Sequence, residues 1–158
     1  MIFVFIIIDE QVASLLKIGK EEKARIRAEH LIREDFTLEA LEIVQLMCEL
    51  LHERVKHLSS EKECPEDLKG AVATLLYATT RVDVSELQEV KRQLIRKYGH
   101  DYVEQLVQIN SNPDDTKVNL RVVEKLAVRP PTADAVIKYL QRAAAEFDVI
   151  WYVMRLAN

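Results

Sequence analysis

The chain has 158 residues, of which 49% are hydrophobic and 30% charged, and its net charge is -4. This length predicts one domain that is large enough to bury a core without disulfides. The acidic balance disfavours nucleic-acid binding, because proteins of that class usually carry a basic surplus. Three glycines and four prolines are too few for a sandwich or barrel, and the glycines lie too far apart for a P-loop or a dinucleotide fingerprint. The composition therefore indicates an all-α fold, and only two cysteines indicate a reduced, intracellular protein.

The first eight residues, Met1 to Ile8, are all apolar and are followed by Asp9 and Glu10. The run is much shorter than the about 20 residues of a membrane span, and it lacks the basic start of a signal peptide. We expect it to pack onto an apolar groove. A membrane-inserting anchor is the alternative, although such anchors usually show a basic face.

Two helices are predicted next. Residues 10–18 form a short helix that ends at Gly19, a typical C′ residue. Residues 20–57 form one long helix, whose first half pairs acidic and basic residues at i,i+4 spacing. Its second half carries an apolar stripe that predicts a face turned toward a core. The stripe comprises Phe36, Ala40, Ile43, Met47 and Leu50, with Leu41, Val44 and Leu51 alongside.

Shorter elements follow a polar loop at 59–64. They are a third helix at 65–80, a fourth at 86–98, a fifth at 100–109, a turn-rich loop at 110–116, a sixth helix at 118–128 and a last amphipathic helix at 132–147. Pro65 is typical of a first helical position. Asp83 or Ser85 is predicted to cap the fourth helix, and Ser85 with Gln88 has the pattern of a capping box. Gly99 is predicted to end the fourth helix, and Thr132 to cap the last one.

No constellation for catalysis or metal binding emerges from the sequence. His52 and His57 are five residues apart, so they do not share the helix face that a zinc-protease motif requires. Cys48 and His52 share a face, but two ligands do not make a zinc site, and we interpret Cys48 as a packed thiol. His30 is interpreted as solvated or salt-linked. With no nucleophile, base and oxyanion hole in view, we expect no enzymatic activity, no cofactor and no metal.

One segment carries a family resemblance. Residues 19–51, with the core RIRAEHLIRED at 25–35, are similar to the second helix of the increased sodium tolerance (Ist) family. Further similarities follow in order at 71–99, 118–131 and 135–149, so that the resemblance covers roughly residues 11–149. The family-motif residues of this chain are Arg25, Arg27, Glu29, His30, Arg33, Glu34 and Asp35. The arginines among them are matched by as many acids and have no interleaved aromatic residue, which argues against nucleic acid as the partner.

The resemblance implies an ESCRT-III-like helical bundle, in which a helical hairpin carries shorter helices and the last helix folds back onto it. It implies a non-catalytic scaffold or regulator that binds ESCRT-III subunits and modulates the action of the Vps-four ATPase, an indirect partner, in multivesicular body sorting. The implied partners are ESCRT-III subunits of the charged multivesicular body protein type. The implied location is the cytoplasm, peripherally on endosomes, and self-association is a further expectation.

Both ends of the chain depart from the family pattern. We expect an atypical apolar segment at 1–10, an Ist-type domain at 11–149 and an atypical tail at 150–158. Most of the first hairpin helix is expected to be missing, and with it a basic surface for membrane binding. The uncovered stripe of the long helix would then be covered by residues 1–8, by a second copy or by an ESCRT-III partner. The alternatives are a generic helical adaptor, or a truncated form that does not assemble or is inhibitory.

The resemblance also suggests where a partner binds. It implies a groove between the long helix and the closing helix that receives a partner's C-terminal helix. Helices in grooves are recognised through apolar anchors at i, i+3, i+4 and i+7. The predicted partner-binding residues are Val136, Tyr139, Leu140 and Ala143 on the closing helix and Leu50, Leu51 and Val55 on the long helix. A simple intramolecular core is the alternative interpretation of the closing-helix residues.

Overall fold

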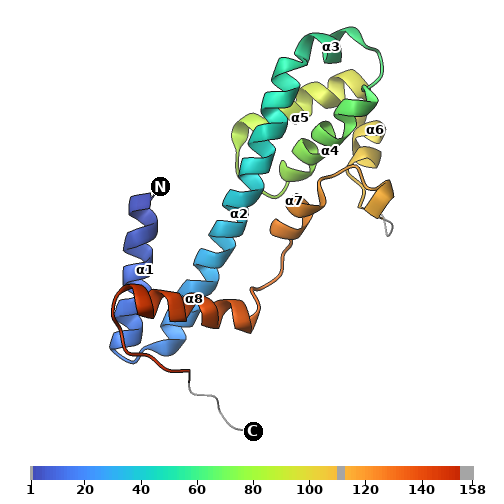
Figure 1. Ribbon diagram of the computed structural model, residues 1–158. Coiled ribbons are helices and arrows are strands. Elements are labelled where there is room, and N and C mark those ends of the chain that lie inside the picture. The colour runs from blue at the N-terminus through green and yellow to red at the C-terminus, as the bar shows by residue number, and fades with distance from the viewer. Residues whose placement is uncertain (1, 110–112, 154–158) are drawn as a thin grey trace. The chain divides into compact units, whose positions relative to one another are not determined.

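The computed structural model describes residues 2–109 and 113–153, with side chains from Glu10 to Ile109 and from Asp114 to Val153 (Figure 1). The elements are α1 (Ile2–Lys17), α2 (Glu21–Glu53), α3 (Val55–Ser60), η1 (Glu66–Leu68), α4 (Lys69–Ala78), α5 (Ser85–Tyr98), α6 (His100–Leu106), η2 (Pro113–Asp115), α7 (Leu120–Lys125) and α8 (Ala133–Glu146). This part of the chain contains no strand, which confirms the all-α class. Within the same residues no helix combines the length and the apolar character that crossing a membrane requires.

The chain forms two compact units. Unit 1 comprises residues 1–35 and 128–158, and unit 2 comprises residues 36–127. The helix α2 contributes its first part to unit 1 and its second part to unit 2. Each unit has a core of its own.

In unit 1 the chain reverses between α1 and α2 (Figure 1). Gly19 has a φ of 73°, a left-handed conformation that favours glycine. Its N–H donates to the Leu16 carbonyl at 3.1 Å, and the N–H of Lys20 donates to the Leu15 carbonyl at 2.9 Å. These two bonds make a Schellman motif, which confirms the predicted end of the first helix at Gly19.

The helix α8 packs on α1 in unit 1. Its N-terminus is capped by Thr132, whose hydroxyl oxygen accepts a hydrogen bond from the N–H of Ala135 at 3.2 Å, as predicted. The core of this unit is rich in alanine, which lets the helices approach closely. Its buried residues are Val12, Ala13, Leu16, Ala24, Ala28, Leu31, Ile32, Val136, Tyr139, Leu140, Ala143 and Ala144.

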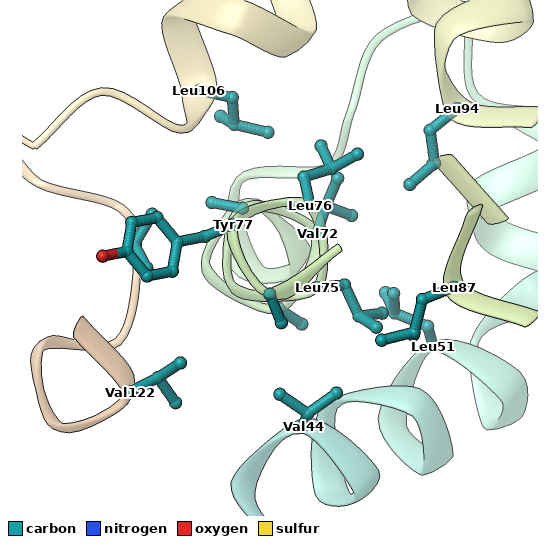
Figure 2. Packing of buried hydrophobic residues seen from close by; sticks show 14 of the residues in the cluster. Val44, Leu51, Val72, Leu75, Leu76, Tyr77, Leu87, Leu94, Leu106 and Val122 are labelled. Carbon is teal, nitrogen blue, oxygen red and sulfur yellow. The ribbon is translucent and has the colours of Figure 1, made fainter. Parts of the chain in front are cut away.

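Unit 2 is built around α4. Every residue from Ala71 to Ala78 is buried, so this helix has no solvent-facing stripe. Figure 2 looks along its axis and shows side chains of α2, α5, α6 and α7 turned toward it, among them Val44, Leu87, Leu106 and Val122. The buried Thr74 hydroxyl donates to the Gly70 carbonyl and accepts from the Asn119 N–H, at 2.7 and 2.9 Å. The start of α7 is therefore fixed to the central helix by a buried hydrogen bond.

Several predicted boundaries were wrong. The first helix begins at Ile2 rather than near residue 10, and the packing expected for Met1–Ile8 lies outside the described side chains. The long helix ends at Glu53, because Arg54 leaves helical dihedrals at φ -100° and ψ 12° before α3 begins. The Arg54 guanidinium pairs with the Asp67 carboxylate at 3.0 Å. This tertiary contact lies at the break, where the sequence has neither glycine nor proline to announce it.

The capping-box prediction at Ser85 was also wrong. Ser85 is the first helical residue and Val84 is the N-cap, so the Ser85 hydroxyl is one position too late to cap α5. It donates to the Glu86 carboxylate at 3.1 Å instead. The Gln88 amide donates to the Thr79 carbonyl at 2.6 Å, which uses the side chain that a capping box would need. Gly99 ends α5 as predicted, with a φ of 90°.

Candidate partner-binding sites

The family-motif residues lie on the part of α2 that belongs to unit 1, and Arg27, His30, Arg33 and Glu34 among them are exposed. Arg25 donates two hydrogen bonds to the Glu21 carboxylate, at 2.7 and 3.1 Å, and His30 pairs with Glu34 at 3.2 Å. The indole N–H of Trp151 donates to the other Glu21 oxygen at 3.3 Å. The hydrogen bond from Arg25 holds the pKa of Glu21 below its usual value. Glu21, at the start of α2, therefore joins one motif residue, Arg25, to the segment after α8 within unit 1.

The closing-helix residues predicted to bind a partner are buried inside unit 1. Val136, Tyr139, Leu140 and Ala143 are all less than a tenth exposed. This burial agrees with the intramolecular core that the sequence left as the alternative. A partner would reach these side chains only after displacing α8, so their role in binding stays a prediction.

The long-helix residues of the same prediction belong to unit 2. Leu51 is buried against α4 and α5, near Leu75 and Leu87 (Figure 2). Leu50 is half-buried, whereas Val55 is 48% exposed. Of these three residues, only Val55 exposes about half of its surface to a partner without any rearrangement. The two halves of the predicted groove thus fall in different units of the structure.

A cavity that the sequence did not suggest lies between α4, α5 and α6. It has a volume of about 380 Å³. Leu76, Ile95, Val103, Val107 and Ile109 supply its apolar lining, and Arg81, Lys91, His100 and Glu104 its polar part. We call it the apolar cavity. Such a mixture of apolar surface with a few charged groups is typical of sites that recognise a peptide or small ligand.

Two contacts hold the polar part of the apolar cavity in place. The Arg81 guanidinium lies 3.5 Å from the centre of the Tyr77 ring and donates to the Tyr77 carbonyl at 3.0 Å. His100 and Glu104 face each other at 3.5 Å across one turn of α6. These groups give the cavity both a cationic and an acidic neighbour, with the cationic side in excess through Lys91.

A second cavity of about 480 Å³ is lined by residues from the segment before α4 and from α4, α5 and α6. Its lining residues are Lys62, Glu63, Cys64, Lys69, Lys97, Tyr98 and Tyr102. We call it the tyrosine cavity. The two tyrosine rings lie 5.6 Å apart between centroids and are tilted by 46°. Their hydroxyl groups are buried and have no hydrogen-bond partner among the described residues.

Burial governs the acid–base properties of the tyrosine cavity. It raises the pKa of Tyr98 to about 12, and it raises the pKa values of Tyr102 and of the Cys64 thiol as well. Both hydroxyl groups are therefore protonated donors at neutral pH, and the thiol is a poor nucleophile. The sequence feature that could have indicated this cavity is the pair of tyrosines four residues apart with lysines nearby. Gly99 lies between the two tyrosines and breaks the helix there, so they do not form a simple i,i+4 pair.

Cys48 is half-buried beside the hydrophobic core of unit 2, which confirms its interpretation as a packed thiol. Over the described ranges no three His, Cys, Asp or Glu side chains gather closely enough to hold a metal ion. The sites that remain are an exposed polar face and two cavities, which suit the binding of another protein. The fold and its sites are those of an α-helical binding domain.

Comparison with known proteins identifies the family. Residues 7–150 match the Ist1 family, described as a regulator of Vps4 activity in the MVB pathway. The chain belongs to this family, as its motif residues indicated. Family members are regulatory proteins of the endosomal multivesicular body pathway.

Relatives and a solved structure support the same assignment. The IST1-like protein of Dictyostelium discoideum is 35% identical over 140 residues, which is 89% of this chain and 37% of that protein. The vacuolar protein sorting-associated protein IST1 of Saccharomyces cerevisiae is 33% identical over 148 residues, covering 88% of this chain and 48% of the relative. The chain thus spans less than half the length of these curated relatives.

A solved structure matches nearly the whole of this chain. The N-terminal domain of S. cerevisiae Ist1, crystallised in complex with the Did2 MIM motif, superposes with a TM-score of 0.79 at 30% identity. The match covers 96% of this chain and 82% of that one. It confirms the expected ESCRT-III-like fold for this chain.

Proposed function

We propose that this chain is a non-catalytic domain that regulates Vps4 in multivesicular body sorting by binding a helical motif of an ESCRT-III subunit. The observation that carries the proposal is the match over 96% of the chain to an Ist1 domain that was crystallised with the Did2 MIM motif. Family membership supports the regulatory role. We further propose that the protein works peripherally on endosomes from the cytoplasm.

We propose the apolar cavity of unit 2 as the binding site for the partner's helix. One of its apolar side chains, Ile109, is 46% exposed and can be contacted without displacing any helix. An amphipathic helix places apolar anchors into such a groove, and acidic residues beside the anchors would face Arg81 and Lys91. The alternative binding site is the one predicted from the sequence, in which Val55 is the exposed residue.

Fluorescence anisotropy with a labelled peptide of the Did2 MIM motif tests the binding function. Saturable binding by a chain whose circular dichroism is helical would support the proposal. A helical chain that fails to bind this peptide and the corresponding helices of other ESCRT-III subunits would overturn it. The generic adaptor would then be the better description.

Two matched variants distinguish the two candidate binding sites. Ile109→Asp changes an apolar side chain that lines the apolar cavity, and Val55→Asp changes one of nearly equal exposure in the alternative binding site. We expect Ile109→Asp to weaken peptide binding at least tenfold, because a carboxylate would replace an apolar contact and repel the acidic residues of the helix. Val55→Asp should leave the affinity unchanged. The reverse result would assign the binding site to the residues predicted from the sequence.

The regulatory role has a test of its own. The ATPase rate of purified Vps4 is measured with ESCRT-III subunits, with and without this chain. We expect the chain to change the rate only when the subunit that carries the helical motif is present, because binding through that motif is indirect. An equal change without any subunit would point to direct action on Vps4.

A further inference from the structure

Arg81 lines the apolar cavity from a turn that immediately follows α4. Its backbone N–H donates to the Ala78 carbonyl at 2.9 Å, and the N–H of Val82 donates to the same carbonyl at 3.0 Å. In the same turn the Thr79 carbonyl accepts a hydrogen bond from the Gln88 amide of α5 at 2.6 Å. The backbone that carries Arg81 is therefore fixed to both α4 and α5, two of the helices whose residues line the cavity.

The guanidinium group of Arg81 is fixed as well. It lies 3.5 Å from the centre of the Tyr77 ring. Its Nη1 donates to the Tyr77 carbonyl at 3.0 Å and to the Thr80 hydroxyl at 2.9 Å. These contacts restrict a long side chain before any ligand arrives, so that little conformational entropy remains to be lost when a ligand binds.

The other edge of this guanidinium has no partner in the part of the chain that the structure describes. Nη1 already makes two hydrogen bonds, which is all that it can donate, whereas Nε and Nη2 donate to none of the described residues. Arg54 shows the ordinary case in unit 2, because it pairs with the Asp67 carboxylate at 3.0 Å. Glu104, the one acid among the described residues that line the apolar cavity, faces His100 instead. Arg81 therefore presents a fixed fork of N–H groups, the geometry that binds both oxygens of a carboxylate.

We propose that Arg81 is the specificity-determining residue of the apolar cavity and selects a partner helix that carries a carboxylate. Nε and Nη2 bind the two carboxylate oxygens, while apolar anchors of the same helix pack on Ile95, Val107 and Ile109. The carboxylate lies three or four residues from an anchor, because these spacings place both side chains on the face that meets the cavity. This inference rests on the proposed function and deepens it, since it names the chemical group that the cavity recognises.

Lys91 brings a second positive charge to the same cavity but lacks this geometry. An ammonium group on a flexible stem acts as a point charge, whereas a guanidinium offers a planar fork. Arg81→Lys keeps the charge and loses the fork, so it should weaken helix binding about tenfold, nearly as much as Arg81→Gln. Lys91→Gln removes only an unfixed charge and should weaken binding about fivefold at most.

Fluorescence anisotropy with the labelled Did2 MIM peptide measures these affinities at one ionic strength. Arg96→Gln is the matched control, because Arg96 is exposed on α5 and is not among the residues that line the apolar cavity. This control removes the same charge and should change the affinity by no more than about twofold. Normal binding by Arg81→Lys would reduce Arg81 to a plain charge and overturn the proposal, as would equal losses in Arg81→Gln and Arg96→Gln.

Substitutions in the peptide test the same contact and leave the fold of the chain untouched. Each acidic residue of the peptide is replaced singly by its amide. We expect one amide peptide, changed three or four residues from an apolar anchor, to bind the unmodified chain about tenfold more weakly than the parent peptide. Arg81→Gln should bind these two peptides equally, because the contact that distinguishes them is gone. If every amide peptide binds the unmodified chain as the parent does, the assignment of Arg81 is wrong and the proposed function stands. If no peptide binds a helical chain, the proposed function fails and the assignment of Arg81 fails with it.

Discussion

The two units of this chain differ in the size of the side chains that fill their cores. Unit 1 brings its helices together through small residues, with Ala24 and Ala28 of α2 completely buried. Unit 2 surrounds α4, which is buried from Ala71 to Ala78, with leucine, valine and aromatic side chains (Figure 2). Close helix packing leaves no room for added volume, whereas a core of large side chains is sensitive to lost volume. Both cavities lie in unit 2, where residues of α4, α5 and α6 line them.

The largest effect is expected from removing volume in unit 2. Leu75 is 2% exposed at the centre of the core, and Leu75→Ala should lower the free energy of unfolding by about 2–5 kcal/mol. Urea unfolding followed by circular dichroism measures this loss. Trp151, the one tryptophan of the chain, lies in unit 1 and reports on that unit through its fluorescence. A loss below 1 kcal/mol would contradict the central place of α4.

The complementary change adds volume to unit 1. Ala28 is fully buried on α2, and Ala28→Leu should cost about 1–3 kcal/mol because the added methyl groups force the helices apart. The measurement is the urea midpoint read from Trp151 fluorescence. Ile26→Leu, at a 68% exposed position of the same helix, is the control and should change the midpoint little. An unchanged midpoint in Ala28→Leu would mean that unit 1 tolerates volume as a loosely packed core does.

The sequence predicted the fold where one residue decides a local geometry. Gly19 and Gly99 end their helices because the left-handed conformation strongly favours glycine, and Thr132 caps α8 because no other residue nearby has a suitable hydroxyl. The buried stripe of α2 followed from helical periodicity. The family motif then supplied the architecture that these local signals leave open.

The sequence failed where tertiary contacts decide. The break at Arg54 has no breaker residue, and Ser85 differs from a true N-cap by one position. The tyrosine cavity joins Cys64 to Tyr102 across 38 positions of the chain, a distance along the sequence that no local pattern reports. For the closing-helix residues the sequence left two interpretations open, because anchors for a partner and a face buried in its own unit have the same spacing.

A smaller effect on stability is expected from two hydroxyl deletions, one at the N-cap of α8 and one at the first residue of α5. Thr132→Ala removes the cap of α8 in unit 1 and should cost about 1 kcal/mol. Ser85→Ala removes a hydroxyl that contacts only an exposed glutamate in unit 2, and its cost should be within 0.5 kcal/mol, about the range of surface substitutions. Thermal unfolding of both variants measures the difference. Equal costs would restore the capping role that the sequence assigned to Ser85.

The smallest effect is a pH dependence at the start of α2. The hydrogen bond from Arg25 lowers the pKa of Glu21 in the folded chain below its ordinary value of 4.5. A carboxyl group with a lowered folded pKa adds stability above its unfolded pKa, and this stability is lost as the pH falls through the folded value. Because Glu21 is 38% exposed, the contribution should stay below about 1 kcal/mol.

The indole of Trp151 makes this small effect measurable at a single site. Its N–H donates to Glu21, so its ¹H–¹⁵N signal should follow the protonation of that carboxyl with a midpoint below pH 4.5. Glu21→Gln should abolish the titration while leaving the signal of a folded chain. In Arg25→Gln the midpoint should move upward, toward the ordinary value, because the main cause of the shift is gone. A signal that does not titrate in the unmodified chain would show that the segment after α8 is not fixed to α2, and the core of unit 1 would then depend on α8 alone to close it.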